Sequence, residues 1–227
     1  MKLLAVETSG FEASIALADG SNVLETQFLP TEGRRHAQIL VPAIDSLLKK
    51  HGLKPAEIEV VAISQGPGSF TGLRVGIVFA KTFAWANGSR LVTVNTLHAI
   101  AQQSRSVAKT IAAVSDAQRK EVFFNHFHFE DDQPICRPQG ETTIVPVADV
   151  VARCPEATLW TGPGTEKFAE AFAGCEIAAE TARNPSAETV AIIGTEAATR
   201  EDFADPGTLE PMYIRRSYAE EKARPAK

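Results

Sequence analysis

Residues 59–76, EVVAISQGPGSFTGLRVG, place a short apolar run, a glycine-rich loop and the start of a second apolar segment in direct succession. The first six residues have the length and continuity of a buried β-strand. The glycines that follow permit the positive φ of a sharp turn, and Ser69 or Thr71 can cap a helix that begins after it. This stretch therefore predicts a strand, a tight turn and a helix, the alternation on which an α/β fold is built.

The glycine spacing does not match the loops that bind phosphate or carry a nucleophile. A P-loop needs a lysine after its last glycine, and Leu73 stands there. Gly66, Gly68 and Gly72 are spaced G-x-G-x-x-x-G, which is not the dinucleotide-binding pattern, and Ser69 has no G-x-S-x-G frame. We therefore predict a structural role for the loop. Its residues are Gly66, Pro67, Gly68, Ser69 and Phe70.

The predicted helix after the loop has a small residue at every fourth position. Gly72, Gly76, Ala80 and Ala84 would form a ridge with little side-chain bulk. A glycine inside a helix costs about 1 kcal/mol relative to alanine, so two on one ridge indicate close approach of another element. The helix is also apolar nearly all round, which is typical of burial in a large core or against a partner. In a chain of this size we favour the partner.

Further strands and helices flank this segment on both sides. Apolar or alternating runs predict strands at Lys2–Glu7, Ala13–Ala18, Asn22–Leu29 and 90–94. Helical spacing of apolar residues predicts helices over 36–52, 71–86 and 96–105. The resulting order β-β-β-α-β-α-β-α indicates a mixed sheet with helices on its faces.

The second half of the chain repeats part of this pattern. A shift of 109 residues places Asp116 on Glu7 and Glu121 on Glu12, each next to apolar strand residues. Helices are expected near 166–173, with Thr165 as the N-cap, and near 186–200. We expect two α/β lobes, an N-terminal lobe over residues 1–107 and a smaller C-terminal lobe over 108–227 with an extended tail.

Composition limits the class of protein. The 227 residues carry a net charge of −5, which gives no sign of the broad basic face that phosphate-based nucleic-acid binding needs. Cys136, Cys154 and Cys175 have no C-x-x-C spacing and follow no signal-peptide pattern, so we expect reduced thiols in a cytoplasmic protein. No apolar run reaches the length of a membrane span.

Two groups of residues are candidates for chemistry. His126 and His128 would share one face of a strand and could begin a metal site, but no third ligand has a recognisable spacing, so an exposed histidine pair is the preferred interpretation. Glu7, Asp116 and their neighbouring glutamates could hold magnesium or act as general acids and bases. The alternative, which we favour, is solvated carboxylates in turns. We expect neither a catalytic residue nor a cofactor.

Several stretches together resemble the TsaB family, the dimerisation subunits of the bacterial machinery that makes threonylcarbamoyladenosine in tRNA. They are LLAVETS, HAQILVPAIDSLL, QGPGSFTGLRVGI, SDAQRKEVFF and EPMYIR. The resemblance spans nearly the whole chain and implies two duplicated lobes of the actin-like (ASKHA, or RNase H-like) fold. One departure is Gln118, because the family commonly has arginine at that position.

The resemblance also implies partners and a site. It implies a non-catalytic scaffold that binds the catalytic subunit TsaD, enables recruitment of the ATPase TsaE, forms a homodimer when alone, and meets tRNA only through the complex. The family pairs through its first two helices, which correspond to His36–Leu48 and Thr71–Phe83. The implied partner-binding residues are His36, Ile39, Leu40, Ala43, Leu47, Thr71, Gly72, Val75, Gly76, Phe79, Ala80 and Phe83. The alternative is an actin-fold ATPase or kinase that binds Mg-nucleotide between the lobes.

Overall fold

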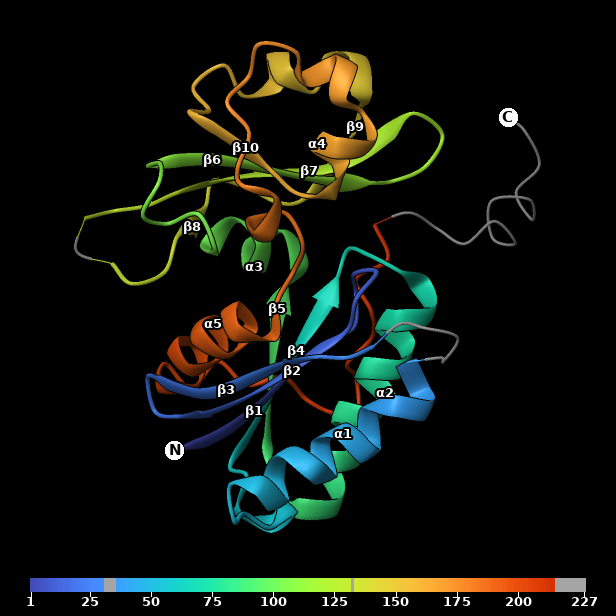
Figure 1. Cartoon of the computed structure of the whole chain (residues 1–227), viewed down its shortest axis with the longest axis vertical. Coiled ribbons are helices and arrows are strands. Elements are labelled where there is room, and N and C mark those ends of the chain that lie inside the picture. Colours follow the sequence, from blue (N-terminus) through green and yellow to red (C-terminus); the bar gives the residue numbers. More distant parts are fainter. Residues whose placement is uncertain (31–35, 132, 215–227) are drawn as a thin grey trace.

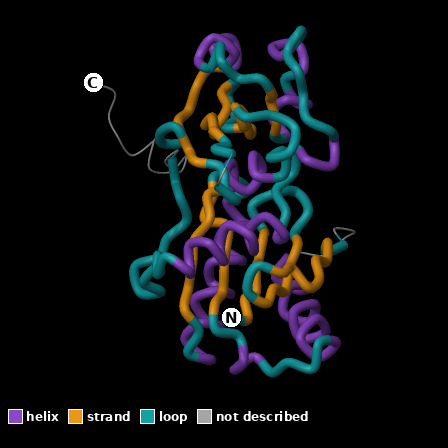
Figure 2. The backbone as a smooth tube through the Cα atoms, turned by 90° about the vertical axis from the view of Figure 1, so that its left-hand side faces the viewer, coloured by secondary structure: helices purple, strands orange, loops and turns teal. Residues whose placement is uncertain are grey.

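Two β-sheets, one from each half of the sequence, organise the fold, with helices between them and on their outer faces (Figure 1). The computed structural model describes residues 1–30, 36–131 and 133–214. The strands of the two sheets gather in separate halves of the molecule (Figure 2). The predicted mixed α/β class is therefore confirmed.

The first sheet has the strand order β3-β2-β1-β4-β5. Its strands are β1 (Lys2–Glu7), β2 (Ser14–Asp19), β3 (Asn22–Phe28), β4 (Val60–Gly66) and β5 (Arg90–Asn95). The first three pair antiparallel, whereas β4 pairs parallel with β1 and β5 pairs parallel with β4. The parallel strands need crossover connections, which the intervening helices supply.

Both faces of the first sheet are covered. The helices that cover it are α1 (His36–Lys50), α2 (Phe70–Asn87) and α5 (Ala187–Thr199). Leu4 and Val6 of β1 point into the core under α1 and α2. Leu3 and Ala5 point to the opposite face, under α5. A strand that is buried on both faces has apolar residues at consecutive positions. Its sequence therefore does not alternate between apolar and polar residues.

Helix α2 begins and ends where its sequence predicts. The Ser69 side chain accepts a hydrogen bond from the backbone N–H of Gly72 at 3.3 Å, so Ser69 is the N-cap and Thr71 is not. Gly88 ends the helix with φ of +72°, a left-handed conformation that favours glycine.

The second sheet repeats the arrangement of the first. Its strands are β6 (Thr110–Asp116), β7 (Glu121–His128), β8 (Arg137–Pro138), β9 (Thr143–Pro146) and β10 (Leu159–Thr161). β7 pairs antiparallel with β6 and with β8 and β9, and β10 pairs parallel to β6. The β10-β6-β7-β9 order thus matches β4-β1-β2-β3, and Asp116 ends β6 as Glu7 ends β1. This topology supports the internal duplication.

The helical segments of the second half differ in part from prediction. The structure has α4 (Pro163–Lys167) and a 3₁₀ helix (Ala169–Phe172) where one helix over 166–173 was expected. The N-cap is Gly162, not Thr165, whose hydroxyl donates to the Gly162 carbonyl at 2.8 Å. Gly162 has φ of +102° and lies against Val114, so the chain turns earlier than predicted. The other 3₁₀ helices are Pro55–Glu57, Val147–Asp149, Val151–Arg153 and Glu180–Ala182.

Two helices lie between the sheets (Figure 1). α3 (Thr96–Gln102) packs on β6 and β7 of the second sheet, and α5 packs on β1, β2 and β4 of the first. A Cβ on Gly194 of α5 would lie 2.5 Å from the Ala62 Cβ, so this glycine lets the helix approach the sheet closely. The lobe boundary between residues 107 and 108 stays a prediction, and α5 lies beyond it in sequence.

Within the described ranges, none of the helices combines the length and apolar character needed to cross a bilayer. The predicted extended tail beyond Ile214 lies outside the described residues.

Candidate functional site

The glycines of the loop and of α2 pack against the segment that follows β1. A Cβ on Gly68 would lie 2.5 Å from the Ser9 carbonyl oxygen, and one on Gly72 would lie 1.9 Å from the Thr8 carbonyl oxygen. A Cβ on Gly76 would lie 2.2 Å from the Thr8 hydroxyl. Close approach by another element was therefore predicted correctly. That element belongs to the same chain.

This contact corrects the prediction that the small-residue ridge meets another subunit. All four ridge residues, Gly72, Gly76, Ala80 and Ala84, are buried, on the face of α2 that packs against the first sheet and the segment after β1. A periodic ridge shows that a helix face is close-packed, but it carries no information about the element that packs there. Large side chains at Gly76 or Ala80 would disturb the fold before they reached any partner.

The other partner-binding residues implied by the resemblance differ in how far they are exposed to solvent. The core of the first lobe buries four of them: Ile39, Leu40, Leu47 and Phe83. Three are half-buried at the edge of this core, namely Ala43, Val75 and Phe79, and one, Thr71, is exposed. His36 begins α1, and its side chain lies outside the described part of the chain. Whether any of them binds a partner stays a prediction.

The outer faces of α1 and α2 carry exposed apolar side chains that are not among the partner-binding residues implied by the resemblance. Val41 of α1 is 57% exposed, and Val78 and Trp85 of α2 are 63% and 85% exposed. The two helices contact each other and lie on the same side of the first sheet (Figure 1). The all-round apolar character of α2 was the available signal, because the sheet covers only one face of the helix.

The end of the described chain runs across α2 and the end of β4. The Met212 N–H donates to the Gln65 carbonyl at 2.8 Å, and Lys81 Nζ donates to the Leu209 carbonyl at 3.1 Å. Arg74 lies over the Phe70 ring, 3.9 Å from its centroid. Its Nε donates to the Tyr213 hydroxyl at 2.9 Å. Residues 209–214 thus cover part of the outer side of α2.

Glu7, a candidate magnesium ligand, is fully buried, which corrects the expectation of a solvated turn carboxylate. Its Oε1 accepts hydrogen bonds from the Ser9 N–H, from the Ser9 hydroxyl at 2.5 Å and from the Gly10 N–H at 3.2 Å. Burial raises the pKa of Glu7 above its usual range, although these hydrogen bonds oppose the shift. The carboxyl group therefore holds the segment on which the glycine loop packs.

The matching acid of the second lobe also has partners. Asp116 forms an ion pair with Lys167 and accepts a hydrogen bond from the Gln118 N–H at 2.9 Å. Gln118 has φ of +63°, so its backbone forms the turn between β6 and β7. Glu12 is exposed, and Glu121 is partly buried at the start of β7.

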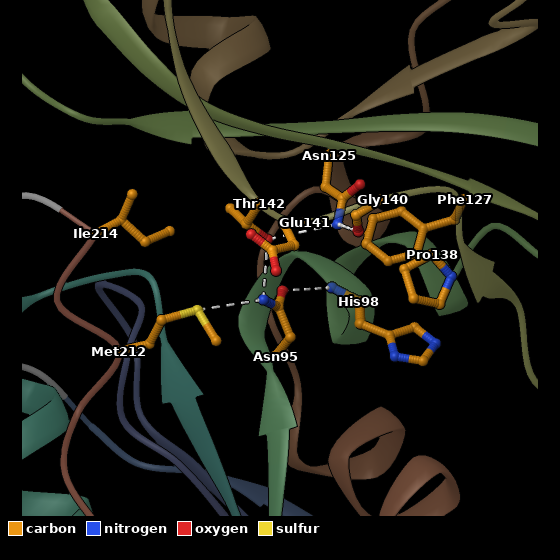
Figure 3. Close-up of a pocket in the computed structure, with 10 residues that line it drawn as sticks. All are labelled: Asn95, His98, Asn125, Phe127, Pro138, Gly140, Glu141, Thr142, Met212 and Ile214. Carbon is orange, nitrogen blue, oxygen red and sulfur yellow. Dashed lines mark hydrogen bonds between the residues drawn. The ribbon is translucent and has the colours of Figure 1, made fainter.

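A cavity of about 460 Å³ lies between the lobes (Figure 3). Asn95, at the end of β5, donates to the Thr142 hydroxyl at 3.0 Å, and Asn125 of β7 donates to the Gly140 carbonyl at 3.1 Å. The lining residues are Asn95, His98, Asn125, Phe127, Pro138, Gly140, Glu141, Thr142, Met212 and Ile214. Among the described residues, the side chains of this lining include the neutral amides of Asn95 and Asn125, the imidazole of His98 and the carboxylate of Glu141.

His98, beside the cavity, is held as a neutral imidazole. Its Nε2–H donates to the Cys136 carbonyl at 2.7 Å, and its ring stacks on Phe127 at a centroid distance of 5.2 Å. Burial lowers the pKa of His98 to about 4. The ring therefore supplies shape and one hydrogen bond here, but no charge at neutral pH.

Comparison with known proteins gives the class to which this fold belongs. The family model described as TsaD, tRNA N6-adenosine threonylcarbamoyltransferase, matches residues 22–207, and the chain belongs to that family. Over its full length the chain is similar to the tRNA threonylcarbamoyladenosine biosynthesis protein TsaB of Bacillus subtilis (strain 168), with 26% identity covering 98% of this chain and 97% of the relative.

Two further comparisons agree. TsaB of Escherichia coli (strain K12) is 29% identical over 150 residues, which cover 61% of this chain and 64% of that protein. The solved structure of YeaZ from Pseudomonas aeruginosa superposes with a TM-score of 0.82 and 26% identity, covering 93% of this chain and 99% of that one. The resemblance to TsaB inferred from the sequence is confirmed.

Proposed function

We propose that this chain is a non-catalytic scaffold subunit in the biosynthesis of threonylcarbamoyladenosine in tRNA, the modified adenosine next to the anticodon. The observation that carries the proposal is similarity over almost the full length to a protein named for that biosynthesis. The catalytic partner would be a TsaD subunit, which belongs to the same family of folds. Shared ancestry makes pairing of two related lobes a reasonable geometry.

The proposed pairing surface is the outer face of α1 and α2. Exposed Val41, Val78 and Trp85 give this face an apolar character that is typical of protein–protein contacts. A stable interface buries on the order of 1,600 Å² in total, and two adjacent helices of 15 and 18 residues can supply one side of it. In the absence of TsaD, the same face would pair two copies of this chain.

The proposed absence of catalysis rests on the state of the candidate acids. Glu7 is buried and hydrogen-bonded to its own loop, and Asp116 is paired with Lys167. A magnesium ion needs accessible carboxylate oxygens.

The remaining partners follow from the same proposal. A net charge of −5 is unfavourable for direct tRNA binding, so tRNA would be held mainly by the rest of a cytoplasmic complex. The ATPase TsaE would be recruited to the assembled pair of this chain and TsaD.

Pairing is tested with variants on exposed positions, which leave the buried ridge intact. Val41→Asp combined with Val78→Asp should weaken co-purification with TsaD by about tenfold or more, because a carboxylate would be desolvated in the interface. Val107→Asp is the matched control, since Val107 is 62% exposed in the loop after α3. Unchanged pairing of the double variant would refute the proposed surface.

The role in tRNA modification is tested by reconstitution with TsaD, TsaE and tRNA. Modification should require the wild-type chain and should fall with the double variant but not with Val107→Asp. Titration of the isolated chain with Mg-ATP separates the scaffold from the alternative ATPase. The scaffold predicts no heat of binding, whereas micromolar binding would favour the ATPase.

A further inference from the structure

Three side chains of different donor type converge on one face of the second sheet. His126 lies on β7, and Cys154 and Glu156 lie in the segment between the 3₁₀ helix Val151–Arg153 and β10. Their nitrogen, sulfur and oxygen donor atoms all lie within 4.8 Å of one another. His126 and Cys154 are separated by 28 positions in sequence, so no spacing motif reveals the cluster.

The local backbone explains why the donors meet. Because side chains alternate along a strand, His126 points to the same face of β7 as Phe124, and the two rings stack. Cys154 packs in the core cluster on that face. The Ala157 N–H donates to the Cys154 carbonyl at 3.1 Å, which closes a turn with Pro155 at a favoured position. This turn brings Glu156 back toward Cys154.

The spacing of the nitrogen and oxygen donors suits a tetrahedral cation. His126 Nε2 and Glu156 Oε1 are 3.6 Å apart, which is longer than an ordinary hydrogen bond. Two nitrogen or oxygen ligands of a tetrahedral zinc ion, each about 2.0–2.1 Å from it, lie roughly 3.4 Å apart. A thiolate ligand at about 2.3 Å from the ion places its sulfur only slightly farther from the other two donors.

We propose that His126, Cys154 and Glu156 form a zinc(II) site with three protein ligands. Cys154 is only 1% exposed, whereas the Glu156 side chain is 57% exposed. The sulfur therefore lies on the protein side of the site and the carboxylate on the solvent side. The fourth position faces solvent and takes water. This site is independent of the proposed pairing through α1 and α2.

Metal binding would change the protonation of the thiol. A cysteine bound to no metal is mostly a neutral thiol at neutral pH. The zinc ligand is the thiolate, so one proton leaves Cys154 as the sulfur–zinc bond forms. Zinc affinity should accordingly increase with pH.

The site would join two segments that backbone pairing leaves separate. β10 pairs with β6, whereas His126 is on β7. An ion bound to His126 and Cys154 would fasten the segment before β10 to the face of β7. Because the ion binds only the folded arrangement, it should raise the melting temperature.

The experiment titrates the full chain with Co²⁺ as a spectroscopic probe and with Zn²⁺ by equilibrium dialysis. We expect one equivalent of bound zinc, thiolate-to-cobalt charge-transfer absorption, and a rise in melting temperature that EDTA reverses. Cys154→Ser should abolish the absorption and lower zinc affinity at least tenfold. Glu156→Gln changes an exposed side chain, so it should weaken affinity with little effect on folding.

Cys175→Ser is the matched control, because Cys175 is a free cysteine of the same lobe outside the cluster. It should bind cobalt and zinc as the wild type does. The site is refuted if the folded wild-type chain binds no zinc. It is equally refuted if Cys154→Ser and Glu156→Gln retain wild-type affinity, which would place the ion elsewhere.

Discussion

Gly72 and Gly76 determine how closely α2 approaches the segment after β1. The small-residue ridge was visible in the sequence, and the close approach was predicted from it. The identity of the neighbour was not predictable, because Thr8 lies 68 positions before Gly76 and no local pattern links them. The same limit applies to Glu7, whose burial depends on strands and helices from distant parts of the chain.

Gly76→Ala should destabilise the protein even though alanine is the better helix former. The new Cβ would lie 2.2 Å from the Thr8 hydroxyl and 2.9 Å from Ile63 Cδ1. Overpacking of this kind costs roughly 1–3 kcal/mol, against a helix-propensity gain of about 1 kcal/mol. Urea unfolding measures the balance. A variant as stable as the wild type would show that the contact relaxes without cost.

Substitution of His98 should reduce the loss of folding stability that occurs as the pH falls. The pKa of His98 is about 4 in the folded protein, below the value of about 6.5 in an unfolded chain. The unfolded state therefore binds a proton first, and stability is lost as pH falls from 6.5 to 4, by roughly 1.4 kcal/mol per pH unit at most.

Comparison of the wild type with His98→Gln by urea unfolding at pH 7 and pH 4.5 tests this assignment. The wild type should lose more stability between the two pH values than the variant does. Equal losses would show that His98 is not held neutral by burial.

At the scale of elements, the strands and helices of the first half could be predicted from the sequence, with ends that shift by a few residues. Continuous apolar runs identified β1 and β4, and capping residues located α2. The second half was harder, because its strands β8 and β9 have two and four residues, too few to establish a period. The course of residues 209–214 could not be predicted either, since it depends on side-chain contacts with α2.

The segment 209–214 has no regular secondary structure, and a buried apolar side chain helps to hold it in addition to its hydrogen bonds. Leu209 is buried in the core of the first lobe, beside α1 and α2. Leu209→Ala should lower the free energy of unfolding by about 2–4 kcal/mol and should increase proteolytic cleavage after residue 205. Glu210→Ala, at an exposed position, is the control and should behave as the wild type. Equal protease resistance of both variants would contradict an anchoring role for Leu209.

At the scale of the whole molecule, the two sheets depend on each other through α3 and α5. The order of elements predicted two lobes, but the packing of α5 on the first sheet was not foreseen, because amphipathic helices do not specify which sheet they cover. Val190 and Ala191 of α5 share a core cluster with Leu3 and Ala5 of β1.

A chain truncated after residue 107 should therefore fail to form a stable lobe. Without α5, the apolar face that contains Leu3, Ala5 and Ala62 is exposed to water. We expect a far-ultraviolet circular dichroism spectrum with reduced structure and no cooperative thermal transition. A cooperative transition of the 1–107 fragment would instead support an autonomous N-terminal domain.

The packing of α5 on the first sheet also means that the sheet is synthesised well before the helix that covers one of its faces. The strands β1, β2, β4 and β5 are complete by residue 95, but their covering helix ends only at Thr199. At about 5–20 residues per second, translation of the intervening chain takes on the order of 5–20 s. During that interval one apolar side of the sheet lacks the cover of α5, so we expect the emerging polypeptide to bind chaperones that recognise exposed apolar strands.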